Sequence, residues 1–133
     1  MIGQMGGVNR REPVAERTLA IELDQRLASL RRGTHRPGEL LTMASAAGYR
    51  SLGWGEGGRI EVGGLADLTS VALTSPRLAG IDPKHAGAGV VFAAAAGDVR
   101  HVIVAGKVVV ADGVHQSIDV AAELQRSINA VWS

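Results

Sequence analysis

Residues Gly57–Leu73 read GGRIEVGGLADLTSVAL, in which two glycine pairs flank short apolar runs. This stretch predicts one short strand at Arg59–Val62 and a second at Ala66–Leu73. Gly63–Gly64 would make the tight turn between them, because glycine readily adopts left-handed backbone conformations. Asp67, at the start of the second strand, would accept hydrogen bonds from nearby backbone N–H groups, which is a structural role.

A β-hairpin is predicted downstream of this stretch. Residues 99–113 read VRHVIVAGKVVVADG, two β-branched runs joined by Ala105-Gly106. A two-residue turn containing glycine between such runs is typical of a hairpin. Between the two β regions, the alanine run of VVFAAAA (residues 90–96) favours a short helix.

Helices are predicted on both sides of the β-rich part. The first begins at Pro13 and ends near Gly33, with Glu22 off its apolar face. That apolar face consists of Leu19, Leu23, Leu27 and Leu30. A second helix is expected over residues 37–50, and a last one from about Ser117, which could cap it.

The chain therefore reads as a mixed α/β fold in four parts. We expect a flexible arm at residues 1–12, a helical segment at 13–54, a small β-sandwich-like portion at 55–115 and a C-terminal helix at 116–133. Three or four short strands cannot cover both helical faces. This arrangement suggests that part of a larger fold is missing.

Composition restricts the partners and the compartment. The net charge is +1 and there is no cysteine among the 133 residues. Weak net charge disfavours a nucleic-acid partner, and the lack of a long apolar run disfavours a membrane span. The first residues lack the apolar core of a signal peptide. Without cysteine there are no disulfides, so we expect a cytoplasmic protein.

Few residues are placed for chemistry. The four histidines lie at least 14 residues apart and form no H-x-H or H-E-x-x-H pattern. His85 and His115 fall in predicted loops. His35, after a helix end, and His101, in the hairpin, are the two remaining candidates for a small diverged enzyme. The residues themselves point to no catalytic or metal-binding group.

Two separated motifs resemble the C-terminal signature of the amidohydrolase superfamily. The first follows G-x-[IL]-x-x-G-x-x-A-D-[LIV] and is matched by Gly58, Ile60, Gly63, Ala66, Asp67 and Leu68. The second follows V-x-x-V-x-x-[GN]-G-[KR]-x-V and is matched by Val99, Val102, Gly106, Lys107 and Val109. The resemblance implies a small β-sandwich beside the last helices of an incomplete TIM barrel.

The segment before these motifs narrows the resemblance. ELDQRL at residues 22–27, RRGTH at 31–35 and GYRSLGW at 48–54 are similar to formimidoylglutamate deiminases. Those enzymes release ammonia from formiminoglutamate in histidine breakdown, and the superfamily binds a divalent metal, usually zinc. The superfamily's H-x-H and terminal Asp are not matched, since Asp24 is the first aspartate. The resemblance thus implies a C-terminal fragment without metal ligands or cofactor.

Two functional hypotheses follow. In the first, the chain is an amidohydrolase fragment that is inactive alone. In the second, it is a non-catalytic interaction module whose apolar helix faces bind a second copy or a separately encoded barrel chain. The partner would accordingly be another copy or the missing barrel.

Overall fold

The computed structural model describes residues 14–132, with side chains from Leu19 onward. The predicted arm at residues 1–12 lies outside this part. The helices are α1 (Val14–Ser29), α2 (Pro37–Thr42), α3 (Gly48–Ser51), α4 (Ala86–Phe92) and α5 (Val120–Trp132). The strands are β1 (Leu68–Val71), β2 (Val99–Val104), β3 (Lys107–Ala111) and β4 (Val114–His115). Within the described chain this is a mixed α/β fold.

The second predicted helix forms as one helical run. A π-helical turn at Met43–Ala47 joins α2 to α3, so the backbone stays helical from Pro37 to Ser51. Pro37 stands in the first turn, where its missing N–H is not needed. The Glu39 carboxylate accepts the N–H of Arg36 at 2.8 Å and fixes the start of the run.

The four strands form one antiparallel sheet in the order β1-β2-β3-β4. The predicted hairpin is confirmed: Val104 pairs with Lys107 across the turn Ala105-Gly106. Both turn residues have positive φ, 49° and 77°, as a type I′ turn requires. The strand predicted at Ala66–Leu73 is present in shorter form as β1.

The strand predicted at Arg59–Val62 is wrong, because these residues form a bend at Arg59 and a turn at Val62 with no strand between them. The two glycines before them, Gly57 and Gly58, lie against the helical run instead. A Cβ on Gly58 would lie 2.5 Å from the backbone N of Ala46, and one on Gly57 would overlap the Tyr49 ring. Gly58 also has a φ of 77°. The first glycine pair is therefore a point of close packing.

Three helix boundaries also differ from the predictions. α1 ends at Ser29, before Gly33, because Leu30 takes a left-handed φ of 54°. α4 covers residues 86–92 and leaves most of the alanine run outside it, since the chain turns at Ala93. α5 begins at Val120, and the carboxylate of Asp119, rather than Ser117, caps it by accepting the N–H of Ala122 at 3.0 Å.

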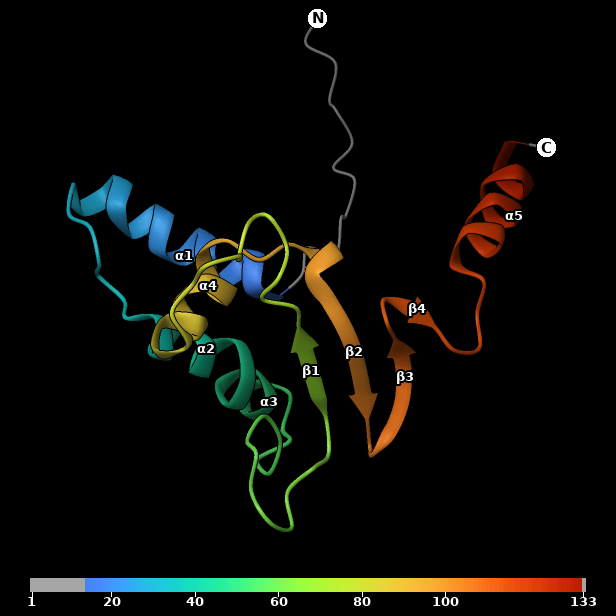
Figure 1. Cartoon of the computed structure of the whole chain (residues 1–133), viewed down its shortest axis with the longest axis horizontal. Coiled ribbons are helices and arrows are strands. Elements are labelled where there is room, and N and C mark those ends of the chain that lie inside the picture. Colours follow the sequence, from blue (N-terminus) through green and yellow to red (C-terminus); the bar gives the residue numbers. More distant parts are fainter. Residues whose placement is uncertain (1–13, 133) are drawn as a thin grey trace, which may run out of the picture.

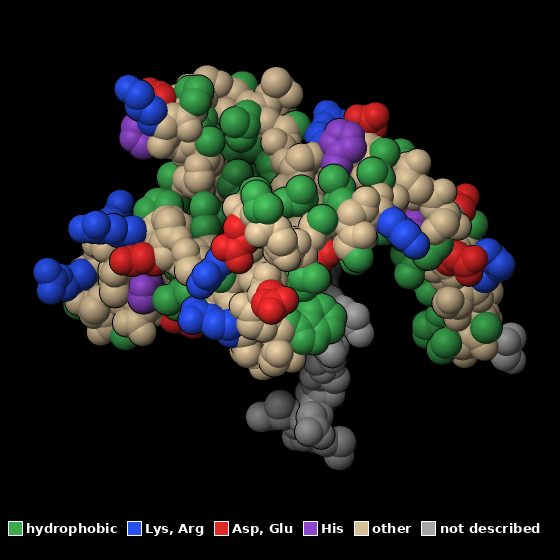
Figure 2. All heavy atoms as spheres, turned by 90° about the horizontal axis from the view of Figure 1, so that it is seen from below, with side chains coloured by type: hydrophobic (Ala, Val, Ile, Leu, Met, Phe, Trp, Pro, Cys, Tyr) green, Lys and Arg blue, Asp and Glu red, His purple; other side chains and the backbone are tan. Residues whose placement is uncertain are grey.

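The small core lies in the helical part. Helices α1, α2 and α4 pack together on one side of the sheet (Figure 1). The buried hydrophobic residues are Leu40, Ala46, Leu78 and Val91. In contrast, no residue of the four strands is buried, and every residue of α5 is exposed. Hydrophobic side chains accordingly reach the surface over the middle of the molecule and along α5 (Figure 2).

None of the helices within residues 14–132 combines the length and apolar character needed to cross a bilayer.

Candidate functional site

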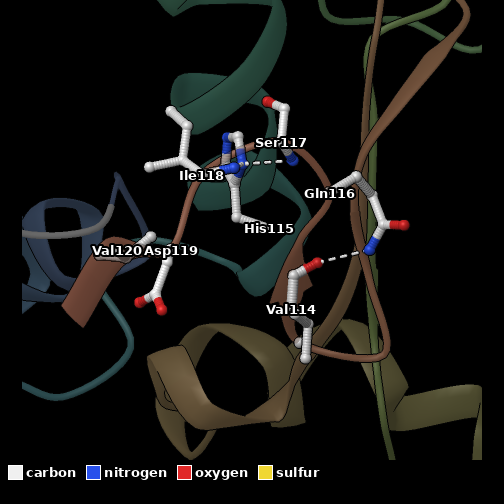
Figure 3. Close-up of a pocket in the computed structure, with 8 residues that line it drawn as sticks. Val114, His115, Gln116, Ser117, Ile118, Asp119 and Val120 are labelled. Atoms are coloured by element: carbon white, nitrogen blue, oxygen red, sulfur yellow. Dashed lines mark hydrogen bonds between the residues drawn. The ribbon is translucent and has the colours of Figure 1, made fainter. Parts of the chain in front are cut away.

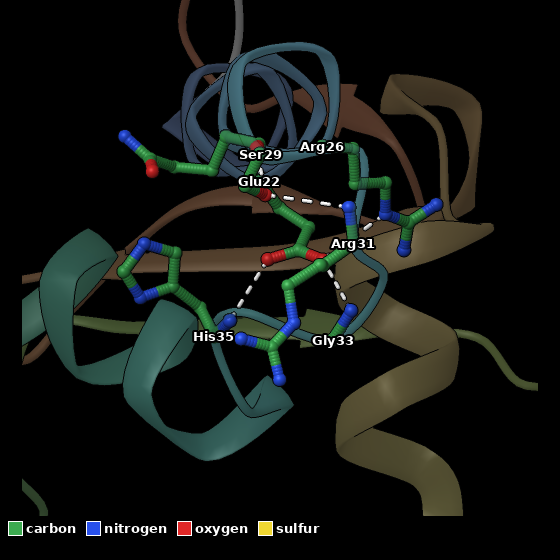
Figure 4. Close-up of polar contacts among 7 residues, drawn as sticks. Glu22, Arg26, Ser29, Arg31, Gly33 and His35 are labelled. Atoms are coloured by element: carbon green, nitrogen blue, oxygen red, sulfur yellow. Dashed lines mark hydrogen bonds and ion pairs between the residues drawn. The ribbon is translucent and has the colours of Figure 1, made fainter.

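Glu22 on α1 is a fully buried carboxylate, although the sequence placed it off the apolar face. Its oxygens accept the backbone N–H of Gly33 at 3.0 Å and that of His35 at 2.9 Å. Arg26, one turn along α1, donates its Nε–H at 3.0 Å (Figure 4). The N–H of His35 is the largest influence that lowers the pKa of Glu22, against the opposing effect of burial. Glu22 thus ties the loop after α1 back to the helix.

Asp67 joins the two halves of the sequence motif. Its carboxylate accepts the backbone N–H of Ala105 at 2.6 Å, and the carbonyl of Ala66 accepts that of Gly106 at 3.0 Å. The residues at the entrance to β1 therefore bind the turn between β2 and β3. These bonds give the Ala66-Asp67 pair a structural role at the end of the sheet.

Tyr49 adds the helical run to this junction. Its hydroxyl donates to the Asp67 carboxylate at 2.5 Å. That bond raises the pKa of Tyr49, whereas the N–H of Ala105, followed by the Tyr49 hydroxyl, lowers the pKa of Asp67. The carboxylate is therefore held ionised and committed to two donors.

The third engaged carboxylate is the buried side chain of Asp98, before β2. Arg77 donates to it from Nε and Nη2, both at 3.1 Å, and the N–H of Ala95 donates at 2.8 Å. The ion pair with Arg77, followed by the Ala95 bond, lowers the pKa of Asp98 to about 2. This bidentate pair connects the loop after β1 to the start of β2.

The remaining motif residues shape the backbone. Gly63 has a φ of 85°, and Gly64 donates its N–H to Glu61 at 3.1 Å, which closes a turn. Ile60 is 91% exposed. Leu68 opens β1 and Lys107 opens β3. None of these residues places a reactive side chain in a cavity.

The two histidine candidates are not brought together. His35 contacts Glu22 through its backbone N–H, and its ring takes no part in that bond (Figure 4). His101 Nδ1 lies 3.0 Å from Ser70 Oγ on β1, and its Nε2 lies 3.9 Å from Asp112. This Ser–His–Asp series is exposed, and the Nε2–Asp112 distance exceeds a hydrogen bond. It lacks the close contacts of a nucleophilic triad.

A large groove lies between the helical run and the sheet. It measures about 860 Å³, and its lining is mainly apolar. Leu41, Ala44, Tyr49, Ile60, Val71 and Val102 are among the lining residues. Its polar side chains are those of Ser45, Tyr49, Trp54, Arg59, Asp67 and Thr69. Asp67 among them is already bound by Tyr49 and Ala105. The groove therefore offers mainly apolar contact area.

The His, Asp and Glu side chains of the described residues do not form a catalytic zinc site. Such a site needs three converging protein ligands and one open position. Within the described residues no three His, Asp or Glu side chains are grouped to hold a metal ion. The buried carboxylates are already bonded to backbone N–H groups and arginines. The site is an apolar groove with Asp67 in its lining, while Glu22 and Asp98 lie outside it.

Sequence reasoning identified Asp67 but missed Glu22, Tyr49 and Asp98. The spacing of Glu22 and Arg26 was a usable signal, because residues four apart on a helix can pair. Nothing local marks Asp98, since Arg77 lies 21 residues before it. Its partner is set by the tertiary fold.

Comparison with known proteins gives the family. The profile of the amidohydrolase family matches residues 8–109, well over half of the chain. A 5-methylthioadenosine/S-adenosylhomocysteine deaminase from Natronomonas pharaonis is 36% identical over 85 residues, 63% of this chain and 19% of that protein. The enzyme of the same name from Syntrophobacter fumaroxidans is 41% identical over 76 residues, 55% of this chain and 16% of that protein.

Solved structures show the same fold. A zinc-bound adenosine deaminase from Xanthomonas campestris superposes with a TM-score of 0.79 at 24% identity, covering 86% of this chain and 26% of that one. A zinc complex of atrazine chlorohydrolase from Arthrobacter aurescens TC1 gives 0.75 at 20% identity, covering 86% and 25%. The chain spans less than a fifth of the curated relatives and about a quarter of the solved structures. It belongs to the amidohydrolase family.

Proposed function

We propose that this chain acts as the non-catalytic closing part of an amidohydrolase-type deaminase. Its helices would correspond to the last helices of a TIM barrel, and its sheet to part of the adjoining β-sandwich. The metal, usually zinc in this superfamily, and the catalytic groups would be held by the complementary barrel.

The exposed apolar surface is the observation that carries this proposal. Four hydrophobic residues of the described chain are buried, whereas 21 large ones are exposed. An apolar surface this large beside so small a core is typical of a site that another protein surface covers.

The hydrogen bonds of the three carboxylates support the proposal that this chain has no activity by itself. A hydrolytic site needs a general base free to take a proton from water. Glu22, Asp67 and Asp98 are each committed to at least two donors. Their role is to hold the fold in shape.

Hydrolysis of a C–N bond with release of ammonia is the reaction proposed for the complete enzyme. The curated relatives are named for methylthioadenosine and S-adenosylhomocysteine, and one solved neighbour for adenosine. The ELDQRL, RRGTH and GYRSLGW segments are similar to formimidoylglutamate deiminases and support formiminoglutamate and histidine catabolism. Since no cysteine is present, a reducing cytoplasm is a suitable compartment.

A second candidate function is an interaction module that binds another copy of itself. The exposed face of α5 supports it, because Val120, Leu124 and Ile128 recur every fourth residue and are all exposed. Light scattering over a range of concentrations separates the two. A concentration-dependent dimer favours self-association, and a monomer at every concentration favours docking on a separate barrel.

The proposed function is tested by exchanging segments. The matched 85 residues of the Natronomonas enzyme are replaced by the corresponding residues of this chain. The chimera is expected to fold, bind zinc and deaminate methylthioadenosine. A folded, zinc-loaded chimera that binds the substrate but releases no ammonia would contradict the proposal. A matched chimera with Glu22→Gln, Asp67→Asn and Asp98→Asn tests the bracing role through its lower thermal stability.

A further inference from the structure

The connection from β4 to α5 is held by a histidine side chain. His115 is half-buried, and its Nδ1 accepts the backbone N–H of Ile118 at 3.1 Å and that of Ser117 at 3.3 Å. Figure 3 shows the ring folded back over these residues beside a cavity lined by residues 113–120. The side chain of His115 thereby closes the turn that leads to α5.

The protonation state of the ring follows from this geometry. A nitrogen that accepts two N–H bonds carries no proton, so the ring is neutral with its hydrogen on Nε2. In the imidazolium form both nitrogens are donors. Protonation would therefore place an N–H against two other N–H groups and break both contacts.

In the described part of the chain, the N–H groups of Ser117 and Ile118 have no acceptor other than His115 Nδ1. The charged side chains on the adjoining segments are Lys107 on β3, Asp112 in the β3–β4 turn, Asp119 in the connection, and Glu123 and Arg126 on α5. The Asp119 carboxylate already accepts the N–H of Ala122, and Glu123 is paired with Arg126. Opposite His115 in the sheet stands Val110, which is uncharged.

We propose that His115 is a proton-sensitive latch that sets the position of α5. The neutral ring holds residues 117 and 118, and the protonated ring releases them. Histidine is the residue type that ordinarily changes charge between pH 5 and 8. Release would change how the exposed apolar face of α5 is presented.

The test is amide exchange measured by NMR on the full chain. Near pH 8, the ring is expected to show the Nε2–H tautomer, and the amides of Ser117 and Ile118 to be protected. On acidification, their exchange, corrected for its intrinsic pH dependence, should rise about tenfold. The rise should share its midpoint with the titration of the His115 ring. An Nδ1–H tautomer, or protection unchanged while the ring titrates, would overturn the proposal.

Two variants distinguish release of residues 117 and 118 by His115 from a loss of protection across the whole chain. In His115→Asn the amide oxygen takes the place of Nδ1 as an acceptor that does not titrate. Protection of both amides should then persist across the pH range. In His115→Ala it should be absent at every pH, while amides in the β2–β3 hairpin stay protected. A pH-dependent loss of protection in the Asn variant would contradict the role of the ring.

Discussion

The helical part, in which α1, α2 and α4 pack together, and the sheet are stabilised in different ways. The helical part and the loop over it bury Leu40, Leu78 and Val91, and Glu22 fixes the loop after α1. In the sheet and α5, the backbone is hydrogen-bonded in a regular register but no side chain is buried. Strands without a covered face gain little from the hydrophobic effect, the main favourable contribution to folding. The sheet and α5 are therefore the part of the described chain whose apolar side chains are left uncovered.

Truncating a core leucine is expected to have the largest effect. Leu40→Ala should lower the free energy of unfolding by about 2–5 kcal/mol, because a fully buried side chain leaves a cavity. The matched change Leu124→Ala on α5 should stay within about 0.5 kcal/mol, since that side chain is exposed. Urea unfolding followed by circular dichroism measures both. Equal losses would remove the distinction between the two regions.

A methyl group on Gly58 should have the next largest effect. Gly58→Ala places a Cβ 2.5 Å from the backbone of Ala46, at a φ of 77°. We expect a loss of about 2–4 kcal/mol from overpacking and strain together. Gly53 is the matched control, because its φ is 83° and its Cβ would meet nothing within 4 Å. Gly53→Ala should cost about 1 kcal/mol, and a similar loss in both variants would argue against close packing at Gly58.

Removing the charge of Glu22 tests the loop connection. Glu22→Gln keeps the shape but loses an acceptor for the N–H of Gly33 or His35 and the ion pair with Arg26. The Tm should fall by about 5–10 °C. Glu123→Gln, which alters the exposed pair with Arg126, should leave the Tm almost unchanged. The idea fails if differential scanning calorimetry gives equal shifts.

Acid should weaken the fold through Asp98 by a smaller amount. Its pKa is lowered from 3.8 to about 2, chiefly by Arg77. Because the folded pKa lies below the unfolded value, the ionised carboxylate stabilises the fold above about pH 4. That stabilisation is lost as the pH falls from 4 toward 2. In Arg77→Gln, stability should depend less on pH in this window, and an unchanged acid profile would show that the pair contributes nothing.

The parts that sequence could predict are those fixed by local chemistry. The hairpin follows from β-branched runs around Ala105-Gly106, and the helical run from Pro37 and the apolar spacing after it. At the strand predicted over Arg59–Val62, the chain is instead held by Gly58 against Ser45 and Ala46 and by Gly57 against the Tyr49 ring. These contacts join segments eight or more residues apart, and they leave no signal inside the strand-like run.

For the carboxylates too, the sequence predicts what depends on neighbouring residues and does not predict partners that the tertiary fold brings close. Asp67 was recognised as a group that binds backbone, but its partner Ala105 lies 38 residues away. Glu22 was placed off the apolar face, because helix periodicity alone does not reveal that a loop folds over it. Polar groups become buried where distant N–H donors converge on them, and a single sequence does not contain that convergence.

Ammonia release by the purified 133-residue chain tests directly whether this chain is catalytic by itself. The chain is incubated with excess zinc and, separately, with formiminoglutamate and with methylthioadenosine. We expect no ammonia above a blank of zinc and substrate, because the carboxylates are bonded within the chain and its histidines lie apart. Saturable release that scales with the concentration of the chain would contradict this expectation.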